Sequence, residues 1–300
     1  MKNRKQSSST PPFLDLHYPQ KAQGVPQKKS IQLGILGKSL AHSLSPKIHQ
    51  YILKAENISG TYRTYEVLEE EIPQVIPMMK KENILGLNVT FPYKETLFHL
   101  VDRVDIHSKN IGAINTIQIK EGLSYGYNTD YLGAISMFKN ANVSLKGKNV
   151  FILGSGGSAK ALIYALHLEG AEKVTVVARN QKAFHALKAQ FPFIEGCDFN
   201  SFIQETPKGD LLVNTTPVGQ FPSTRESPVP GNVLPNFEIL CDIVYNPLMT
   251  TFLNLAKKQN LKIVTGLSML IHQGIAAEEI WLDRKINDCL CKEIEDFLTI

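Results

Sequence analysis

The chain has 300 residues, of which 43% are hydrophobic, and it carries a formal net charge of +4. This length and this hydrophobic content suffice for a sizeable core and suggest about two domains. The sequence contains no run of 18 or more apolar residues and no signal-peptide pattern, which argues against membrane insertion and secretion.

The positive charge is concentrated at the N-terminus. Residues 1–30 contain six lysines and arginines and one aspartate, which leaves a net charge of −1 on the rest of the chain. They are also rich in Ser, Pro, Lys and Gln, which predicts a flexible basic extension, with a targeting segment as the alternative. No basic stripe interleaved with aromatic residues follows, so we expect no nucleic-acid partner. The four cysteines show no metal-like spacing, which favours a reduced, cytoplasmic compartment and no metal site.

The folded part begins with an alternation of strands and helices. Residues 32–36 predict a strand, and a helix is expected to start at Ser45 as N-cap, with Pro46 at the first helical position. Ser43 lies in the same loop, so two hydroxyls are available to a polyol or a carboxylate. A second strand at 61–67, a helix at 69–81 and a third strand then complete a parallel βαβαβ unit.

The stretch from Gly86 to Lys94 carries the first candidate chemistry. An apolar run ends at Thr90, and Pro92 suits the first turn of a following helix. Asn88, Thr90 and Lys94 therefore surround one strand end, where open α/β sheets bind ligands. A cation is disfavoured at a helix start, so Lys94 is a candidate general acid or base, with a solvated surface lysine as the alternative.

Residues 112–127 alternate in the manner of a β-hairpin that turns at Glu121-Gly122, and they include Asn115. Asp130 follows, just before a helix expected over residues 131–140. The pattern favours Asp130 as the N-cap of that helix. Capping does not exclude chemistry, because backbone N–H groups hold a carboxylate rigidly.

A glycine-rich turn opens the second half of the chain. A strand at 149–153 runs into Gly154-Ser-Gly156-Gly157-Ser-Ala159 and then a helix. This matches the dinucleotide pattern G-x-G-x-x-A, in which the glycines allow a tight turn and close approach of a pyrophosphate.

The next predicted strand, at 173–178, ends at Arg179-Asn180. Proteins that prefer NAD usually place an acid near this strand end to bind the ribose 2′-hydroxyl, whereas an arginine accommodates a 2′-phosphate. Because Arg179 occurs here and an acid does not, NADP is the expected cofactor.

Three later strands end in polar or turn residues that are expected to point into the same cleft. These ends lie near Thr215, Tyr245 and Gly266, and the last leads into a helix on which Met269 and Gln273 share a face.

The C-terminal stretch is predicted to be helical, with Trp281 and Phe297 in the core. Cys289 and Cys291 lie two residues apart, so they point to different faces of a helix. We therefore interpret them as ordinary buried residues rather than a redox pair.

Eight pieces of the sequence, in chain order, resemble the shikimate dehydrogenase family along nearly all of residues 31–285. The matching pieces are His42-Ser-Leu-Ser45-Pro46, Asn88-Val-Thr90-x-Pro92-x-Lys94, Gly112-Ala-Ile-Asn115-Thr116, Asn128-Thr-Asp130, the Gly154 turn, Asn214-Thr-Thr-Pro217-x-Gly219, Asp242-x-x-Tyr245-x-Pro247-x-x-Thr250 and Gly266-x-x-Met269-x-x-x-Gln273. The resemblance implies a two-lobed α/β fold, with an N-terminal α/β substrate domain and a Rossmann-like, doubly wound NADP-binding domain. It also implies reversible NADPH-dependent reduction of 3-dehydroshikimate to shikimate, a step of aromatic amino-acid biosynthesis.

The resemblance further implies roles for individual residues. Lys94 and Asp130 look like the catalytic pair, in which the lysine donates the proton during reduction and the aspartate orients it. The residues implied to surround the substrate are Ser43, Ser45, Asn88, Thr90, Lys94, Asn115, Asp130, Tyr245 and Gln273. The residues implied to bind NADP(H) are Gly154, Ser155, Gly156, Gly157, Ser158, Ala159, Arg179, Asn180, Thr215, Val244, Gly266 and Met269.

These pieces predict two lobes with the active site between them, closing around the substrate. The expected substrate lobe comprises residues 31–130 and 266–300, and the expected nucleotide lobe comprises residues 131–265. We expect a monomer or homodimer whose partners are small molecules. Two alternatives stay open, namely a relative that oxidises quinate with NAD and a non-catalytic regulator of the same fold. The presence of the lysine and aspartate pair favours the enzyme.

Overall fold

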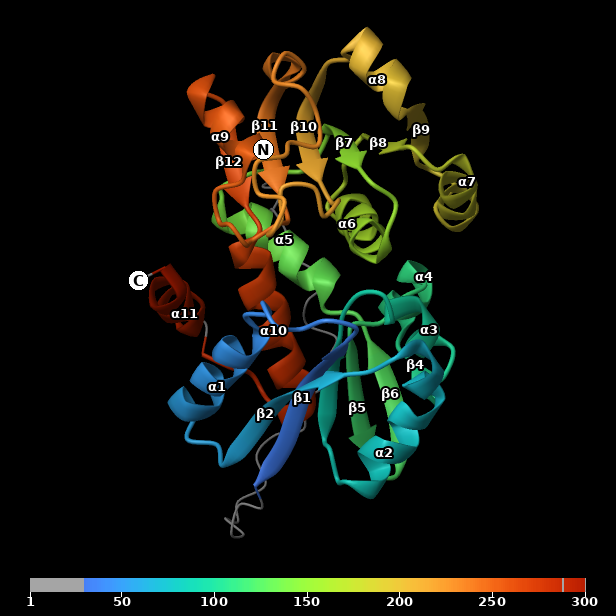
Figure 1. Ribbon diagram of the computed structural model, residues 1–300, viewed down its shortest axis with the longest axis vertical. Helices are drawn as coiled ribbons and strands as arrows, with labels where there is room; N and C mark the ends of the chain where they lie inside the picture. The colour runs from blue at the N-terminus through green and yellow to red at the C-terminus, as the bar shows by residue number, and fades with distance from the viewer. Residues whose placement is uncertain (1–29, 288, 300) are drawn as a thin grey trace, which may run out of the picture.

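Two mixed layers of strands and helices build the molecule, as the computed structural model of residues 30–287 and 289–299 shows (Figure 1). The predicted extension at residues 1–30 lies outside the described residues, apart from Ser30. Six strands between residues 31 and 127 form one sheet, here the N-terminal sheet. Six strands between residues 149 and 265 form the second, the C-terminal sheet. The predicted alternation of strands and helices is confirmed.

The N-terminal sheet joins three parallel strands to an antiparallel hairpin. In spatial order its strands are β2 (Gly60–Glu66), β1 (Ile31–Gly37), β3 (Gly86–Val89), β5 (Thr116–Lys120), β6 (Leu123–Tyr127) and β4 (Arg103–Val104). β1 pairs in parallel with β2 and β3, as the predicted βαβαβ unit requires. β3 pairs antiparallel with β5, which sets Asn88 opposite Thr116.

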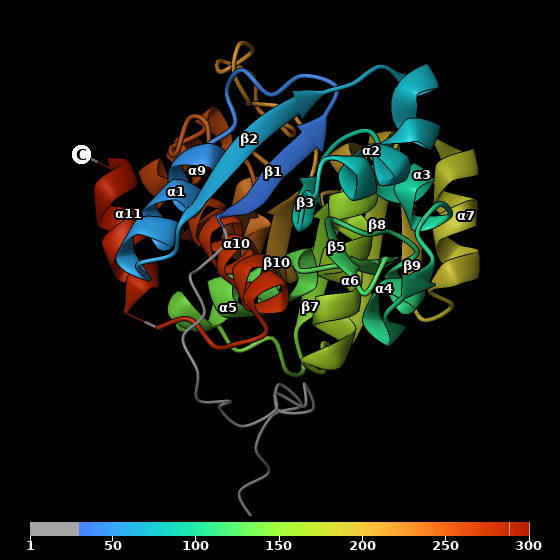
Figure 2. The ribbon, with the colours of Figure 1, turned by 90° about the horizontal axis from the view of Figure 1, so that it is seen from below.

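Helices cover both faces of this sheet. They are α1 (Ser45–Ala55), the 3₁₀ helix η2 (Glu69–Gln74), α2 (Val75–Lys81), α3 (Lys94–Phe98), α4 (Ile106–Ile111) and, from the far end of the chain, α10 (Leu267–Leu282). Side chains alternate along β1, so Leu36 packs with the apolar cluster of α2, whereas Leu33 and Ile35 pack with that of α1 and α10. Figure 2 shows α1 and α2 on opposite sides of β1 and β2.

The C-terminal sheet is parallel throughout and doubly wound. Its strands, in spatial order, are β12 (Lys262–Thr265), β11 (Phe237–Asp242), β10 (Gly209–Asn214), β7 (Asn149–Leu153), β8 (Lys173–Ala178) and β9 (Glu195–Asp198). Its helices are α6 (Gly157–Leu168), α7 (Gln181–Gln190), α8 (Phe199–Glu205), the short 3₁₀ helix η3 (Leu234–Asn236) and α9 (Thr251–Lys258). The strand order reverses beside β7, and ligands bind open α/β sheets at such a point.

Two helices connect the sheets and pack closely on each other. α5 (Asp130–Asn140) and α10 lie side by side between the layers, and α11 (Leu290–Thr299) packs beside α10 (Figure 1). A Cβ atom on Gly133 would lie only 2.5 Å from the carbonyl oxygen of Met269, so the glycine allows this close approach. α10 therefore carries residues from the C-terminal end of the chain to the N-terminal sheet, where Trp281 is buried as predicted.

The two predicted serine and aspartate N-caps are wrong by one position. Ser45 and Asp130 are the first helical residues of α1 and α5. In each case the side chain two positions earlier accepts the backbone N–H, from Ser45 to Ser43 Oγ at 3.3 Å and from Asp130 to Asn128 Oδ1 at 3.0 Å. Because Ser45 and Asp130 lie inside the helices and do not cap them, their side-chain oxygens are left for other partners.

Four further expectations need correction. Residues 69–81 divide into η2 and α2, since Pro77 lacks the N–H that a continuous helix needs. Pro92 precedes α3 instead of lying in its first turn. Phe297 is 49% exposed, because α11 turns only one narrow apolar face toward α10. Cys289, which precedes α11, is exposed too.

Within the described ranges, none of the helices combines the length and the apolar character that crossing a membrane requires. The same residues contain no group of three or more His, Cys, Asp or Glu side chains suited to a metal ion.

Candidate active site

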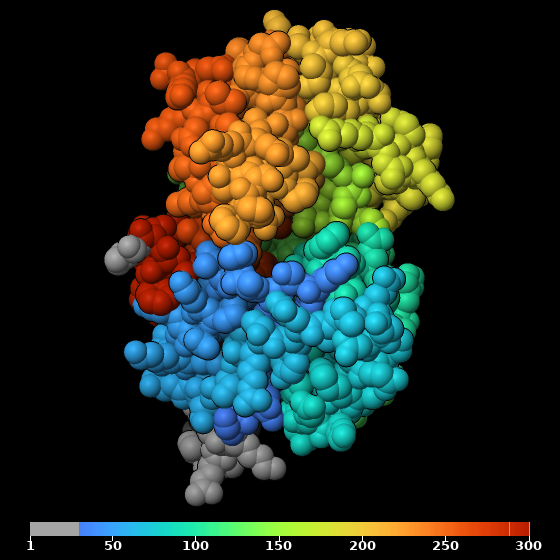
Figure 3. Space-filling view, viewed as in Figure 1, coloured from blue at the N-terminus to red at the C-terminus, as the bar shows by residue number. Residues whose placement is uncertain are grey.

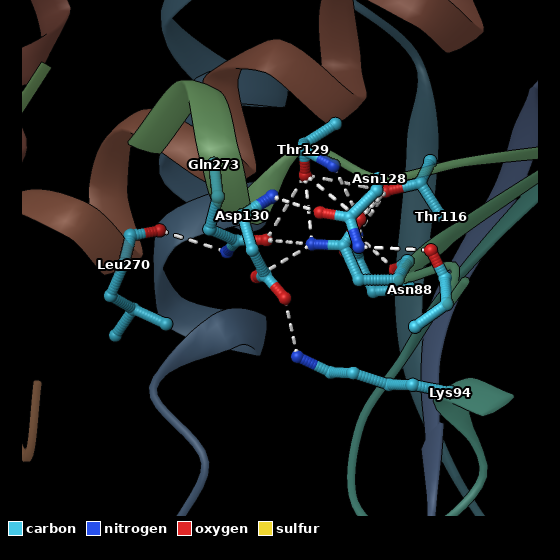
Figure 4. Close-up of polar contacts among 10 residues, drawn as sticks. Asn88, Lys94, Thr116, Asn128, Thr129, Asp130, Leu270 and Gln273 are labelled. Carbon is cyan, nitrogen blue, oxygen red and sulfur yellow. Dashed lines mark hydrogen bonds and ion pairs between the residues drawn. The ribbon is translucent and has the colours of Figure 1, made fainter. Parts of the chain in front are cut away.

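Lys94 and Asp130 form an ion pair beyond the carboxyl end of β3 in the N-terminal sheet. Lys94 begins α3 and Asp130 begins α5, and the distance from Nζ to Oδ2 is 2.6 Å (Figure 4). Their side chains are only 15% and 8% exposed. Each charge is thus largely removed from water, so each depends on the other, and breaking such a pair costs about 3–5 kcal/mol. The positive end of α5 further stabilises the carboxylate.

Asn115 locks the other oxygen of this carboxylate in place. Its Nδ2 lies 2.8 Å from Asp130 Oδ1 and 3.2 Å from Gln273 Oε1, and its Oδ1 accepts the N–H of Thr129 at 2.7 Å. Gln273 comes from α10 and also donates to the carbonyl of Leu270. Segments up to 158 residues apart therefore meet in one hydrogen-bonded network (Figure 4).

Asn88 extends the network into β3. Its Oδ1 accepts the hydroxyl of Tyr62 at 2.7 Å, and its Nδ2 donates to Thr116 Oγ1 at 3.2 Å. Burial and the nearby Glu278 carboxylate raise the pKa of Tyr62, against a smaller opposing effect of a hydrogen bond with Ser45. The phenol stays protonated and donates, which fixes the orientation of the Asn88 amide.

Sequence reasoning missed three members of this network. Thr129 lies within a motif that already pointed to Asp130, so the sequence held a signal for it. Thr116 follows Asn115 directly and could have been found in the same way. Tyr62 is an ordinary aromatic residue of a predicted strand, and only the packing of β2 against β1 brings it to Asn88.

Ser43, Thr90 and Tyr245 lie outside this hydrogen-bonded network among the described residues. All three are half-buried. Tyr245 follows β11 and packs with the apolar cluster around α1 and α10, and burial raises its pKa. It is thus a side chain from the C-terminal sheet that contacts the N-terminal half of the molecule.

The glycine turn after β7 fits a dinucleotide. Gly154 has φ of +110°, and a Cβ there would approach Thr215 Oγ1 to 2.9 Å, so this position requires glycine. Around Gly156 nothing lies within 4 Å of the place a Cβ would take, which leaves open space beside the backbone. Ser155 in the same turn and Ser158 in the first turn of α6 are half-buried. Such a turn can hold a pyrophosphate at the helix N-terminus.

This turn faces Lys94. Gly157 begins α6, and a Cβ on it would lie 3.6 Å from Lys94 Cδ. An ion pair of 2.8 Å between Lys160 and Glu95 ties α6 to α3 beside this contact. The predicted cofactor turn and the predicted catalytic pair therefore lie next to each other between the two sheets.

On one side of the molecule a loop of the C-terminal half lies against a loop of the N-terminal half. Figure 3 shows the orange surface, which belongs to the loop after β10, resting against the blue surface of the first loop of the chain. His42 and Phe221 make an edge contact there, with ring centroids 4.8 Å apart.

Arg179 and Asn180 differ in what occupies their side chains. Both are exposed at the end of β8. Asn180 caps α7 by accepting the N–H of Ala183 at 3.1 Å, so this predicted cofactor residue has a structural role. The guanidinium of Arg179 lies 4.4 Å from the centre of the Phe199 ring and keeps its donors exposed to an incoming phosphate.

Gly266, Val244 and Met269, also predicted to bind cofactor, have evident packing roles. A Cβ on Gly266 would lie 2.3 Å from the carbonyl oxygen of Ile243, so glycine is needed where α10 begins. The N–H of Val244 donates to Asp242 Oδ1 at 3.0 Å, and Met269 is buried in the core between α5 and α6.

Asp242 is a buried residue that accepts several hydrogen bonds. It begins the motif Asp242-x-x-Tyr245-x-Pro247-x-x-Thr250, but sequence reasoning assigned it no role. It accepts hydrogen bonds from Asn214 Nδ2 at 2.9 Å and from Thr250 Oγ1 at 2.7 Å, besides the Val244 N–H. Burial raises the pKa of Asp242 to about 6, although these donors oppose the shift. The three donors come from two strand ends and a helix cap, so Asp242 holds this edge of the C-terminal sheet together.

Comparison with known proteins shows the same two halves. A family model described as "Shikimate dehydrogenase substrate binding domain" matches residues 35–117, and one described as "Shikimate / quinate 5-dehydrogenase" matches residues 136–226. A curated protein of Clostridium perfringens (strain 13 / Type A), named shikimate dehydrogenase (NADP(+)), is 40% identical over 272 residues, covering 88% of this chain and 97% of that protein. The chain belongs to the shikimate dehydrogenase family.

Solved structures of shikimate dehydrogenases share its two-lobed α/β fold with a Rossmann-like lobe. Shikimate dehydrogenase 1 of Peptoclostridium difficile is 38% identical, with a TM-score of 0.83, and the match covers 90% of this chain and 98% of that one. The Thermus thermophilus enzyme, solved in complex with NADP(H) and shikimate, is 32% identical with a TM-score of 0.80, covering 88% and 98%.

Proposed function

We propose that the chain catalyses the reversible NADPH-dependent reduction of 3-dehydroshikimate to shikimate, acting as an oxidoreductase on a CH–OH group in aromatic amino-acid biosynthesis. The observation that carries this proposal is the 2.6 Å ion pair of Lys94 and Asp130 beside the glycine turn, where Lys94 Cδ lies 3.6 Å from the position that a Cβ on Gly157 would take. Quinate oxidation with NAD is not favoured, because the curated relatives at about 40% identity are named for shikimate and NADP.

Lys94 is the proton donor in this proposal. NADP(H), when bound, supplies or accepts the hydride. The carbonyl oxygen of the substrate gains negative charge during reduction, and Lys94 Nζ holds a proton at the place where that charge develops. In the reverse direction the lysine takes the proton of the substrate hydroxyl.

Asp130 positions the lysine and contributes to substrate binding. Its Oδ2 holds the ammonium while Asn115 holds its Oδ1, so the carboxylate does not rotate when the proton leaves Lys94. An arrangement that is fixed before the reaction avoids reorganisation during it.

The remaining polar side chains supply donors and acceptors to the hydroxyls and the carboxylate of the substrate. We assign this role to residues of both halves, namely Ser43, Ser45, Asn88, Thr90, Asn115, Tyr245 and Gln273. Support comes from the network that already orients Asn88, Asn115 and Gln273, since a pre-oriented amide loses little freedom on binding.

The proposed cofactor residues lie along the C-terminal ends of the parallel strands. The glycine turn of residues 154–159 would hold the pyrophosphate, and Arg179 the 2′-phosphate. The residues that would border the cofactor are Asn180, Thr215, Val244, Gly266 and Met269. All of them except Thr215 also have the structural roles described above.

We further propose the division into a substrate lobe, residues 31–130 with 266–300, and a nucleotide lobe, residues 131–265. The two sheets and the two family matches support it. A cytoplasmic location and a monomeric or homodimeric state complete the proposal. No disulfide joins the cysteines within the described residues, which is in keeping with a reducing compartment.

The test follows nicotinamide absorbance in four mixtures that cross shikimate and quinate with NADP and NAD. We expect turnover mainly with shikimate and NADP, and Lys94→Ala should lower kcat by about 10²–10⁴-fold. The matched control is Lys120→Ala, which removes a lysine from a half-exposed pair with Asp283 and should leave kcat unchanged. Turnover of quinate with NAD would assign the sister activity instead, and ligand binding without turnover would indicate a regulator.

A further inference from the structure

A second hollow of the molecule lies between α5, α10 and α11. Its volume is about 610 Å³, within the range of small-molecule sites. Asn140, His272 and Cys291 line it, one from each helix. The residues assigned to the substrate and the cofactor above do not line this hollow, so it is a separate site.

The three side chains form a chain of contacts toward the thiol. Cys291 Sγ lies 3.3 Å from His272 Nδ1, and His272 Nε2 lies 2.7 Å from the amide of Asn140. If the amide donates, the ring proton is on Nδ1 and points at the sulfur. If the amide is turned over, Nε2–H donates to its oxygen and Nδ1 takes the proton of the thiol. In the first arrangement the Nδ1–H can stabilise a thiolate, and in the second Nδ1 can accept the thiol proton when the cysteine reacts; the thiolate is the nucleophilic form of cysteine.

The lining carries both signs of charge. Glu279 and Glu295 face the hollow together with Lys285 and Lys292. The two lysines are themselves within ion-pair distance of carboxylates, Lys285 of Glu279 at 2.8 Å and Lys292 of Asp296 at 2.9 Å. Such a lining complements a small molecule that carries an ammonium and a carboxylate better than a plain anion or cation.

We propose that Cys291 is a covalent modification site that forms a mixed disulfide with disulfides that carry both ammonium and carboxylate groups, of the cystine or glutathione-disulfide class. The thiolate of Cys291 attacks one sulfur of the reagent, so a new S–S bond forms as the reagent's S–S bond breaks. The other half leaves as a thiolate and takes up one proton, which replaces the proton that the Cys291 thiol lost, so protons balance in either arrangement of the ring. Cysteine is oxidised and the reagent is reduced, so electrons balance without another oxidant.

The attached group would sit on the far side of a helix that serves the active site. His272 immediately precedes Gln273 on α10, and Gln273 contacts Asn115 in the buried network. The modification site and the proposed substrate site are therefore two faces of one helix.

The test measures mixed-disulfide formation on the full chain with oxidised glutathione at pH 7, resolved by peptide mass spectrometry. Cys289 is an internal control, because it is exposed and lies two residues away. We expect Cys291 to react about tenfold faster than Cys289, although it is the less exposed of the two. His272→Gln should slow Cys291 by about tenfold and leave Cys289 unchanged, whereas His185→Gln, at a histidine of α7, should change neither.

Equal rates for the two cysteines, or a His272→Gln variant with an unchanged ratio, would overturn the proposal. Asn140→Ala gives a second, milder variant at an exposed end of α5, and thermal unfolding of each variant shows whether it is folded. Neutral bis(2-hydroxyethyl) disulfide tests the reactant class. With this reagent we expect a smaller ratio of the Cys291 rate to the Cys289 rate than with oxidised glutathione, and an equal ratio would refute selection by the charged lining.

Discussion

Two buried aspartates, one in each half of the molecule, are held in opposite ways. Asp130 has a cation, Lys94, at 2.6 Å, whereas Asp242 accepts only from neutral donors and burial raises its pKa to about 6. Asp130 begins α5 and Asp242 ends β11, and both lie in pieces of the sequence that carry the family resemblance. The difference teaches that a buried carboxylate becomes available for chemistry when the side chain that faces it, here the Lys94 ammonium, can give up a proton. Surrounded by amide, hydroxyl and backbone donors, it becomes part of the framework.

Replacing Asp130 with Asn should have the largest effect on activity. The variant keeps the shape of the side chain but removes the charge that orients Lys94, so kcat should fall by about 10²–10⁴-fold. Steady-state kinetics with shikimate and NADP measure the loss, and Asp283→Asn, in the half-exposed pair with Lys120, is the matched control. Activity close to that of the unmodified protein would show that Asp130 is framework as well.

Replacing Asp242 with Ala should reduce stability more than chemistry. The change leaves Asn214, Thr250 and the Val244 N–H without their buried acceptor, which should cost about 2–4 kcal/mol of unfolding free energy. Urea unfolding measures this cost, with Asp296→Ala on the exposed face of α11 as the control. A loss of kcat without a loss of stability would contradict the framework role.

Arg179 differs from both buried aspartates, because its charged group lies at the surface of the protein. Arg179→Gln should raise KM for NADP about tenfold, because one charge-assisted contact to a phosphate is lost, and should leave KM for NAD unchanged. Arg63→Gln, at an exposed position of β2, controls for net charge. An equal change for both cofactors would remove Arg179 from the basis of NADP preference.

The smallest expected effect is a pH dependence of stability at Asp242. Because its folded pKa of about 6 lies above the unfolded value, the folded state binds the proton more tightly. Burial of the ionised carboxylate therefore lowers the unfolding free energy above pH 6, and this loss decreases as the pH falls toward 4. Relative to Asp242→Asn, the unmodified protein should gain about 1 kcal/mol between pH 7.5 and pH 5. Urea midpoints at both pH values test this, and a parallel shift in both proteins would refute it.

Local pattern sufficed for the longer strands and for the glycine turn, whereas the short strands β4 and β9 were not predicted. The alternation of apolar residues depends on near neighbours, and Gly154 is required by its own backbone angle of +110°. Motif resemblance then pointed to Lys94, Asn115 and Asp130 as residues of interest. The helix starts were harder to predict, since α1 and α5 begin at Ser45 and Asp130 and not after them.

The sequence by itself therefore determined the alternation of the main strands and helices, the dinucleotide turn and the family to which the chain belongs. Tertiary structure alone decided which of these pieces meet, such as Asn115 with Gln273 across 158 residues, and Gly157 with Lys94 across the cleft. It also decided that Phe297 is exposed and that Cys291 lies beside His272. The physical reason is that periodicity reports which face of an element is apolar, whereas contacts between elements depend on strand order and helix packing.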